Sequence, residues 1–249
     1  MEAWQLALAF VGSLVAGYLG SALGLVLGTL RLPVILLVSG SPSAAAGTNI
    51  AISAAAAATG SIRHARAGRV DWRVVAWMAP PSVAGATLGG LYGGALPERL
   101  LLLGVALVLA WSGVDLIYRP FRVRPKPAPE AGPAVVFGFL IGLLGGALGV
   151  ILGTLRVPAL LAAVGLPAAR VVGTNLVCGF LLGVAGFAAH AARLEVEWGI
   201  LVAGLAGAIP GGWLGARLTG RLSERRLRRA LGAALLAVSG ALVLEAALS

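Results

Sequence analysis

The chain has 249 residues, of which 59% are hydrophobic and only 11% are charged, and its mean hydropathy is +0.97. Soluble domains contain roughly 45–50% apolar and about 25% charged residues, so this composition excludes an ordinary soluble domain and predicts an all-α polytopic membrane protein. The formal net charge of +10 does not predict nucleic-acid binding, because the arginines lie mostly between apolar runs, where they orient membrane helices.

The first half of the chain predicts a broken helix followed by three longer helices. Residues 4–28 are apolar, and Pro33 disfavours helix in the residues before it, so we expect Arg31 to lie in non-helical backbone. Lipid does not tolerate unpaired backbone groups, so such a break must be buried in protein or line a wet cavity. Ser41 can cap the next helix, with Pro42 as its first residue. The three longer helices are expected at 42–62, 73–95 and 100–118.

A linker and a second half follow. Residues 119–133 are basic, rich in proline and without apolar periodicity, and we expect them to form a cytoplasmic linker between residues 1–118 and residues 134–249. The second half is expected to contain a helix at 134–153, a break at 153–158, a second break at 165–167, and helices that end near 191, 218 and 247.

The two halves are copies of one design. The segment GYLGSALGLVLGTLRLP at 17–33 matches GLLGGALGVILGTLRVP at 142–158 without a gap. After one inserted residue in the second half, GTN at 47–49 matches GTN at 173–175, and His64 matches His190. The domain organisation is therefore predicted to be two homologous repeats, 1–118 and 134–249.

Loop charges predict that the two repeats are inverted in the membrane. Residues 63–73 hold four arginines and one aspartate, whereas the matching loop near 194 has one arginine and two glutamates. The next pair of loops shows the opposite bias, with one arginine near 98 and six between 217 and 229. By the positive-inside rule, matching loops lie on opposite sides of the membrane. Each repeat must then cross an odd number of times, as a broken or re-entrant first region, or a pair of short spans, plus three spanning helices.

Glycines spaced by four residues precede the first proline, at Gly20, Gly24 and Gly28, and recur at 85, 89 and 93; this spacing is typical of close helix packing. With the GTN motifs and the G-x-V-D-W segment at 68–72, the ladder makes the sequence resemble the TauE/SafE sulfite exporter family over nearly its whole length. The resemblance implies a multi-pass transporter of small sulfur-containing anions, such as sulfite or organosulfonates, in the inner membrane of a bacterial or archaeal cell. Arg31 and Arg156 are not expected as general features of that family, so the substrate within the family stays open.

The presence of two intramembrane arginines at equivalent positions requires an explanation. Placing one arginine near the bilayer centre costs about 2.5–3.5 kcal/mol of free energy. One interpretation is a pair of guanidinium groups that bind one oxyanion, assisted by the N-termini of the broken helices and by neutral hydrogen bonds. The alternative is that each arginine caps carbonyls freed by its own break, or extends to an interface. The candidate substrate-binding residues are Arg31, Arg156, Asn49, Asn175, Thr29, Thr154, Thr48, Thr174, Gly28 and Gly153.

His64 and His190 are candidates for proton coupling, although a histidine at a helix end beside basic residues is more typical of an interface. All nine acidic residues fall in predicted loops, termini or helix ends, so no carboxylate is expected in mid-membrane to carry a coupling ion. Asp71 and Glu197 are expected at helix N-termini, and the single cysteine, Cys178, is expected to be a packing residue.

The predicted function is export of a sulfur-containing oxyanion by alternating access between the repeats. The alternatives are an anion channel and a transporter of a non-sulfur anion such as a small carboxylate. An intramembrane enzyme would need a nucleophile with a base, paired acids or a metal cluster, and the predicted helix interiors contain none of these, so we expect no enzyme activity, cofactor or metal. The sequence leaves the oligomeric state and the transport direction open.

Overall fold

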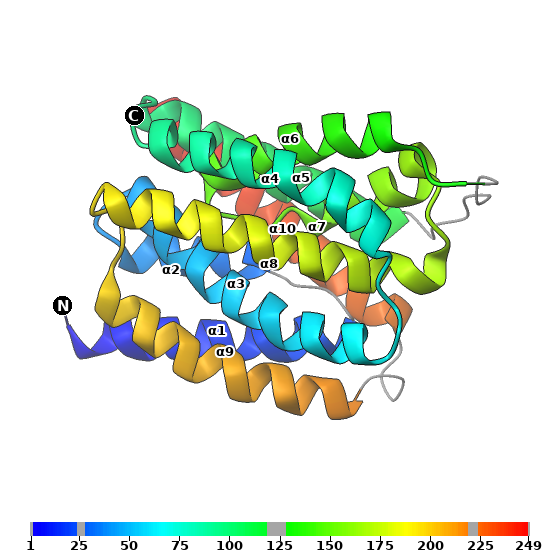
Figure 1. Ribbon diagram of the computed structural model, residues 1–249. Helices are drawn as coiled ribbons and strands as arrows, with labels where there is room; N and C mark the ends of the chain where they lie inside the picture. The colour runs from blue at the N-terminus through cyan, green and yellow to red at the C-terminus, as the bar shows by residue number, and fades with distance from the viewer. Residues whose placement is uncertain (1, 24–27, 119–127, 219–223, 249) are drawn as a thin grey trace.

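The computed structural model describes residues 2–23, 28–118, 128–218 and 224–248, and these residues form a bundle of helices without strands (Figure 1). This confirms the prediction of an all-α membrane protein. The first half contains α1 (Ala3–Leu23), α2 (Gly28–Val38), α3 (Pro42–Arg66), α4 (Trp72–Gly93) and α5 (Glu98–Tyr118). The second half contains α6 (Ala131–Leu148), α7 (Gly153–Pro158), the π-helix η1 (Ala159–Val164), α8 (Ala168–Ala192), α9 (Trp198–Leu218) and α10 (Glu224–Leu248). The predicted linker lies largely outside the described residues, as do Gly24 of the glycine ladder and part of the basic loop before α10.

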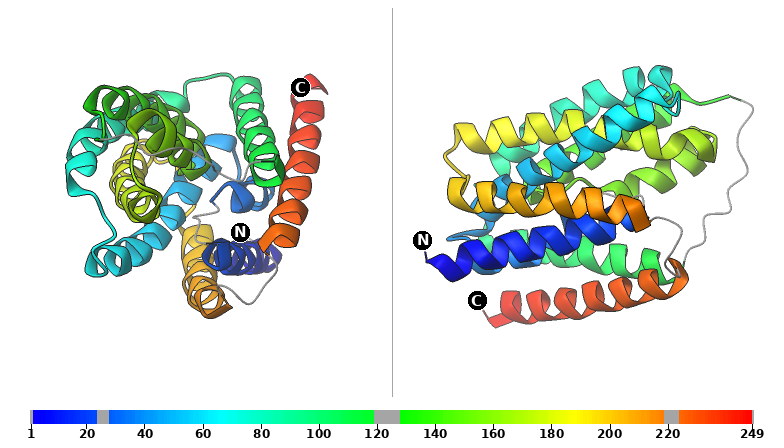
Figure 2. Two further views of the ribbon diagram at one scale, coloured as in Figure 1. Left: turned by 90° about the vertical axis from the view of Figure 1, so that its right-hand side faces the viewer. Right: turned by 90° about the horizontal axis from the view of Figure 1, so that it is seen from below.

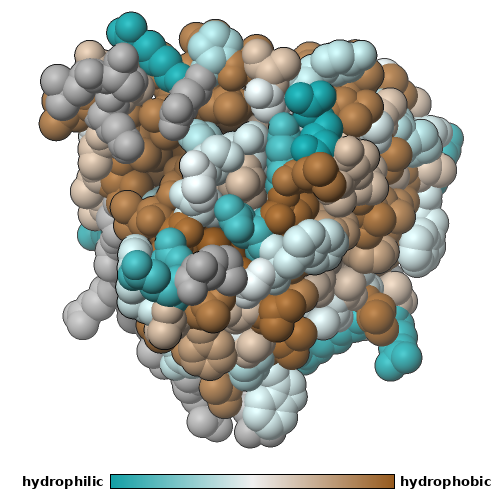
Figure 3. Space-filling model, turned by 90° about the vertical axis from the view of Figure 1, so that its left-hand side faces the viewer, coloured by the Kyte–Doolittle hydropathy of each residue, from teal (hydrophilic) through white to brown (hydrophobic). Residues whose placement is uncertain are grey.

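The surface of the bundle suits a lipid environment. Within the described ranges, three segments are long and apolar enough to cross a membrane by length and composition: Trp72–Gly93, Ala131–Leu148 and Arg170–Ala192. Large apolar side chains on other helices also face outward; Leu107 of α5 is 72% exposed and Val202 of α9 is 65% exposed. At the end of the bundle that holds the N-terminus, hydrophilic groups interrupt this apolar surface (Figure 3). An apolar belt of this kind is favourable in hydrocarbon and unfavourable in water.

The predicted positions of the two chain breaks are wrong. Arg31 and Pro33 lie inside α2, and residues 153–158 are helical as α7. In the second half the break falls earlier, at 149–152, where Gly149 has φ 67° and donates its N–H to the Gly145 carbonyl. A left-handed glycine is the usual end of a helix, whereas a proline removes only one hydrogen bond and can be passed when the helix is held by packing. After Pro158 the chain continues directly into the wider turns of η1.

The GTLRLP and GTLRVP segments therefore begin half-length helices. The 11 residues of α2 rise about 16 Å, roughly half the hydrocarbon thickness of a bilayer. The first residues of these helices, Gly28 and Gly153, are buried. Whether each broken region is re-entrant or a pair of short spans stays a prediction.

Helices of the two halves alternate with one another instead of forming two separate bodies. The main helix pairs join one half to the other: α1 with α9, α4 with α6, α3 with α8, and α5 with α10. Figure 2 shows α1 (blue) along α9 (orange) and α5 (green) along α10 (red). The central helices α3 and α8 run in opposite directions along the bundle (Figure 1). The orientation of the two repeats relative to a membrane stays a prediction.

Glycines bring α4 and α6 into backbone contact, as the four-residue spacing predicted. A Cβ atom at Gly89 would overlap the carbonyl oxygen of Leu143, and a Cβ atom at Gly146 would overlap that of Ala86. In membrane proteins such contacts replace the hydrophobic driving force that water supplies to soluble bundles.

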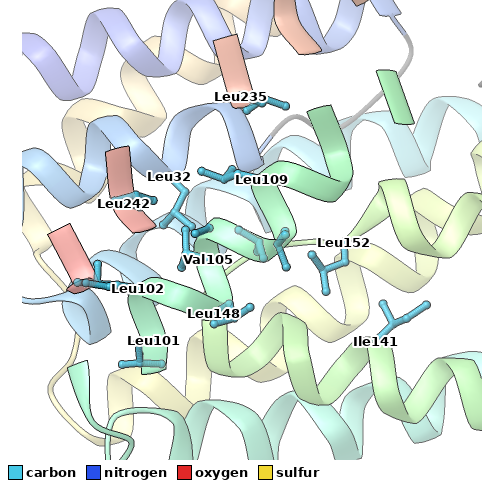
Figure 4. Packing of buried hydrophobic residues seen from close by; sticks show 14 of the residues in the cluster. Leu32, Leu101, Leu102, Val105, Leu109, Ile141, Leu148, Leu152, Leu235 and Leu242 are labelled. Carbon is cyan, nitrogen blue, oxygen red and sulfur yellow. The ribbon is translucent and has the colours of Figure 1, made fainter. Parts of the chain in front are cut away.

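One hydrophobic cluster anchors both half-length helices. It includes Leu32 of α2, Leu109 of α5, Leu152 just before α7, and Leu235 of α10 (Figure 4). Leu32 and Leu152 are each adjacent in sequence to a predicted site residue, Arg31 and Gly153 respectively. The cluster therefore fixes both GTLR segments in the interior of the bundle.

Candidate functional site

Arg31 lies on α2 and is buried, with 2% exposure. Among the described residues, its hydrogen-bond partners all belong to α3. Nε donates to Asn49 Oδ1 at 2.9 Å, and Nη2 donates to Ser53 Oγ at 2.6 Å and to the Asn49 carbonyl at 3.3 Å. Asn49 and Ser53 are four residues apart, so they lie on one face of α3. The edge of the guanidinium formed by Nε and Nη2 is thus filled by the protein.

Asn49 also satisfies backbone groups next to the starts and ends of helices. Its Nδ2 donates to the Gly28 carbonyl at 3.2 Å and to the Gly149 carbonyl at 2.8 Å. Gly28 begins α2 in the first half, and Gly149 follows α6 in the second half. One asparagine therefore joins Arg31 to the broken regions of both halves.

Arg156 has a different environment, although it occupies the equivalent position on α7. Its side chain is 0% exposed, and a hydrogen bond runs from Nη1 to Asn175 Oδ1 at 3.5 Å. Nε and Nη2 are buried and have no hydrogen-bond partner among the residues that the structure describes. No carboxylate of the described residues pairs with either arginine. A buried cation without a partner is strongly unfavourable, so this group is the clearest candidate for an anion ligand.

The threonines of the GTN motifs hold the two halves together. Thr48 Oγ1 accepts the backbone N–H of Glu197 at 2.9 Å, and Thr174 Oγ1 accepts the backbone N–H of Asp71 at 3.0 Å. Each bond runs from one half to the residue that precedes a long helix of the other half. A direct role of these hydroxyls in substrate binding stays a prediction.

The remaining predicted residues lie close to the two arginines. Thr29 is buried on α2, and Thr154 of α7 shares a hydrogen bond of 3.0 Å with Ser112 of α5. A Cβ atom at Gly153 would lie 3.2 Å from Asn175 Nδ2, so α7 begins in contact with α8.

His190 is fully buried within the bundle, in the last turn of α8. Its Nε2 lies 2.8 Å from the Gly146 carbonyl and its Nδ1 lies 2.9 Å from Glu195 Oε2. A carbonyl only accepts hydrogen bonds, so Nε2 is the donor in the contact with Gly146. The imidazole therefore links the end of α8 both to α6 and to Glu195. His64, the counterpart, is half-buried and its Nδ1 has no partner among the described residues.

Among the described residues no group of three His, Cys, Asp or Glu side chains could hold a metal ion. Asp115 lies near the end of α5, as predicted for all acidic residues, but it is buried, with 4% exposure.

A mostly apolar cavity of about 440 Å³ lies beside the second half of α2. It is lined by α2, by the connection to α3, by α5 and by α10, through residues that include Pro33, Leu36, Ser41, Leu102 and Leu242. None of the predicted site residues lines it, so the cavity is separate from the buried guanidinium groups.

Sequence reasoning missed Ser53, Ser112, Gly149 and Glu195, which contact the predicted residues. The sequence did contain a signal for Ser53. It follows Asn49 by four residues, which places both on one face of a helix, and the equivalent residue after Asn175 is Gly179.

Comparisons with known proteins cover almost the whole chain. The family model described as "Sulfite exporter TauE/SafE" matches residues 8–242. A "Probable membrane transporter protein" of Xylella fastidiosa (strain Temecula1) is 32% identical over 90% of each chain. The "Probable membrane transporter protein YjnA" of Bacillus subtilis is 27% identical over 93% of this chain and 94% of the relative. No solved structure matches the chain significantly.

Proposed function

The chain belongs to the TauE/SafE family and is a membrane transporter, and we propose that it exports a small sulfur-containing oxyanion such as sulfite or an organosulfonate across the bacterial or archaeal inner membrane. The observation that carries the proposal is the guanidinium of Arg156, which is fully buried and has two donors without a partner among the described residues. An oxyanion supplies both the negative charge and the acceptor oxygens that this group lacks. Arg31, Asn49 and Asn175 surround the same broken regions and complete the polar interior.

Burial of both arginines supports alternating access over a permanently open channel. The side chains are 2% and 0% exposed, so an anion reaches them only if helices move. We expect this movement around α3 and α8, where the two halves meet in the centre of the bundle. Inverted-repeat transporters bind their substrates at such junctions between broken helices, and they expose the junction to one side at a time.

The membrane potential is the proposed driving force. An interior-negative potential favours exit of an anion by about 2.3 kcal/mol per charge per 100 mV, so export needs no co-transported ion. The His190–Glu195 pair is the group in the described structure that would serve proton coupling instead, because a buried imidazole lies there within hydrogen-bond distance of a carboxylate.

A small carboxylate is the second candidate substrate, and a specific feature favours it. A carboxylate presents two coplanar oxygens, which also fit the two unpaired donors of Arg156. The geometry of the site therefore fits both chemical classes of anion, and the proposal of a sulfur-containing anion depends on the family to which the chain belongs.

The test is a thermal-shift screen of the purified protein against sulfite, sulfate, thiosulfate, organosulfonates and oxalate. A ligand that binds only the native state raises its apparent stability, so sulfite or a sulfonate should raise the melting temperature. Arg156→Lys should lose most of this shift at similar expression, because lysine keeps the charge without the fork of donors. If Arg31→Lys and Arg156→Lys both bind and transport sulfite as the unmodified protein does, the site lies elsewhere. Flux that never saturates with substrate would instead favour a channel.

A further inference from the structure

We propose that the two equivalent arginines have different tasks: Arg156 alone binds the anion, side-on through Nε and Nη2, and Gly179 leaves its guanidinium without the serine hydroxyl that Arg31 has. Arg31 is a structural cross-link between α2 and α3. This inference rests on the proposed function and narrows it to one asymmetric site.

One position in each repeat contributes to the asymmetry. Ser53 follows Asn49 by four residues, and its hydroxyl lies 2.6 Å from Nη2 of Arg31. Gly179 follows Asn175 by the same four residues and has no side chain. A Cβ atom built at Gly179 would lie 3.5 Å from Nη1 of Arg156, so a side chain here would touch the guanidinium. The second half therefore lacks the hydroxyl that pairs the arginine of the first half.

The two arginines also use different edges of the guanidinium group for their hydrogen bonds to the protein. Arg31 directs Nε and Nη2 at Asn49 and Ser53. Arg156 directs Nη1 at Asn175, and its Nε and Nη2 have no partner in the described part of the chain. These two N–H groups lie in one plane and point in the same direction, which is the geometry that holds two oxygens of one anion.

The chemical class of the ligand follows from this geometry. It is an oxyanion that presents two oxygens about as far apart as those of a sulfonate, a sulfite or a carboxylate. A halide offers a single sphere and uses only part of the fork, so chloride should bind much more weakly. The guanidinium is fully buried, so the anion is held away from water, where charge-assisted hydrogen bonds are strongest.

The experiment compares Gly179→Ser with Gly179→Ala. Both variants add a Cβ atom, which would lie 2.9 Å from Cγ2 of Ile151, so they share the same steric cost. Only serine adds a hydroxyl beside the guanidinium of Arg156, carried by a Cβ atom 3.5 Å from Nη1, where it competes with the anion for the buried cation. Sulfite, methanesulfonate, acetate and chloride are titrated by calorimetry into the purified full-length protein in detergent. Gly179→Ser should bind the preferred oxyanion about tenfold more weakly than Gly179→Ala; equal affinities would overturn the inference, as would chloride binding as tightly as every oxyanion.

A ligand-free measurement keeps the inference testable if both variants lose binding. Gly179→Ser should then melt at a higher temperature than Gly179→Ala, because its hydroxyl lies beside the buried guanidinium and can accept a hydrogen bond from it; no difference, or the reverse order, would refute it. Ser53→Ala provides the reciprocal control. It should melt at a lower temperature but keep the anion affinity within about twofold, and a tenfold loss would show that Arg31 also binds the anion. If the unmodified protein binds none of the four anions, the proposed function itself fails.

Discussion

Removal of the two GTN hydroxyls tests whether these motifs join the halves of the protein or bind substrate. In Thr48→Val and Thr174→Val the side chain keeps its branched shape but loses the oxygen that accepts a backbone N–H from the opposite half. Both hydrogen bonds are partly buried, so the unpaired N–H regains some contact with water. The expected cost is therefore at the lower end of the usual range, about 1 kcal/mol for each variant.

The assay is thermal unfolding of purified protein in detergent. For a chain of this size, 1 kcal/mol corresponds to roughly 2–4 °C in melting temperature. Because α3 and α8 run in opposite directions, the two threonines, each near the start of its helix, lie at opposite ends of the bundle (Figure 1). The stability changes caused by substitutions at distant sites add, so the melting temperature of the double variant should fall by roughly 4–8 °C.

Thr48→Ser and Thr174→Ser are the matched controls, since they keep the hydroxyl and lose only a methyl group. They should melt close to the unmodified protein. Sulfite affinity should be unchanged in all of these variants, because the hydroxyls are already occupied by the backbone. A loss of affinity without a loss of stability in the valine variants would refute this reasoning and make the threonines substrate ligands.

Three further predictions concern topology, backbone strain and driving force. Reporters fused at 67 and 194 should read cytoplasmic and external respectively, and finding both on one side would exclude inverted repeats. Leu194 has φ 60° where the first half has Gly68 with φ 66°, so Leu194→Gly should raise the melting temperature by a few degrees, as relief of about 1 kcal/mol of strain implies; an unchanged or lower value would contradict this. In liposomes with a potassium–valinomycin potential and equal pH on both sides, flux should follow the sign of the voltage. Flux that ignores voltage but needs a proton gradient would place the coupling at His190 instead.

Local chemistry made part of the fold predictable. Ser41 caps α3 by accepting the N–H of Ala44, with Pro42 as the first helical residue, as the sequence indicated. Asp71 caps α4 in the same way. Such ends depend on side chains within three residues, so they can be read without knowledge of the rest of the chain.

The breaks could not be placed in this way. Proline was the strongest local signal, but Pro33 and Pro158 both lie within helices. The second half breaks instead at Gly149, whose carbonyl is bound by Asn49 of the other half. A glycine-rich membrane segment can leave the helical conformation where a distant group donates a hydrogen bond to the carbonyl that is freed. Only the tertiary structure supplies that donor.

The difference between the arginines also belongs to the tertiary structure. By itself the sequence determined that two nearly identical segments place a permanent charge in an apolar interior, and this was enough to predict an anion site. It presented Arg31 and Arg156 as equals, because the residues that separate them stand 22 and 23 positions further along the chain, at Ser53 and Gly179. Packing of each half-length helix against its long neighbour brings those positions to the guanidinium, where Ser53 adds a hydroxyl that Gly179 cannot supply.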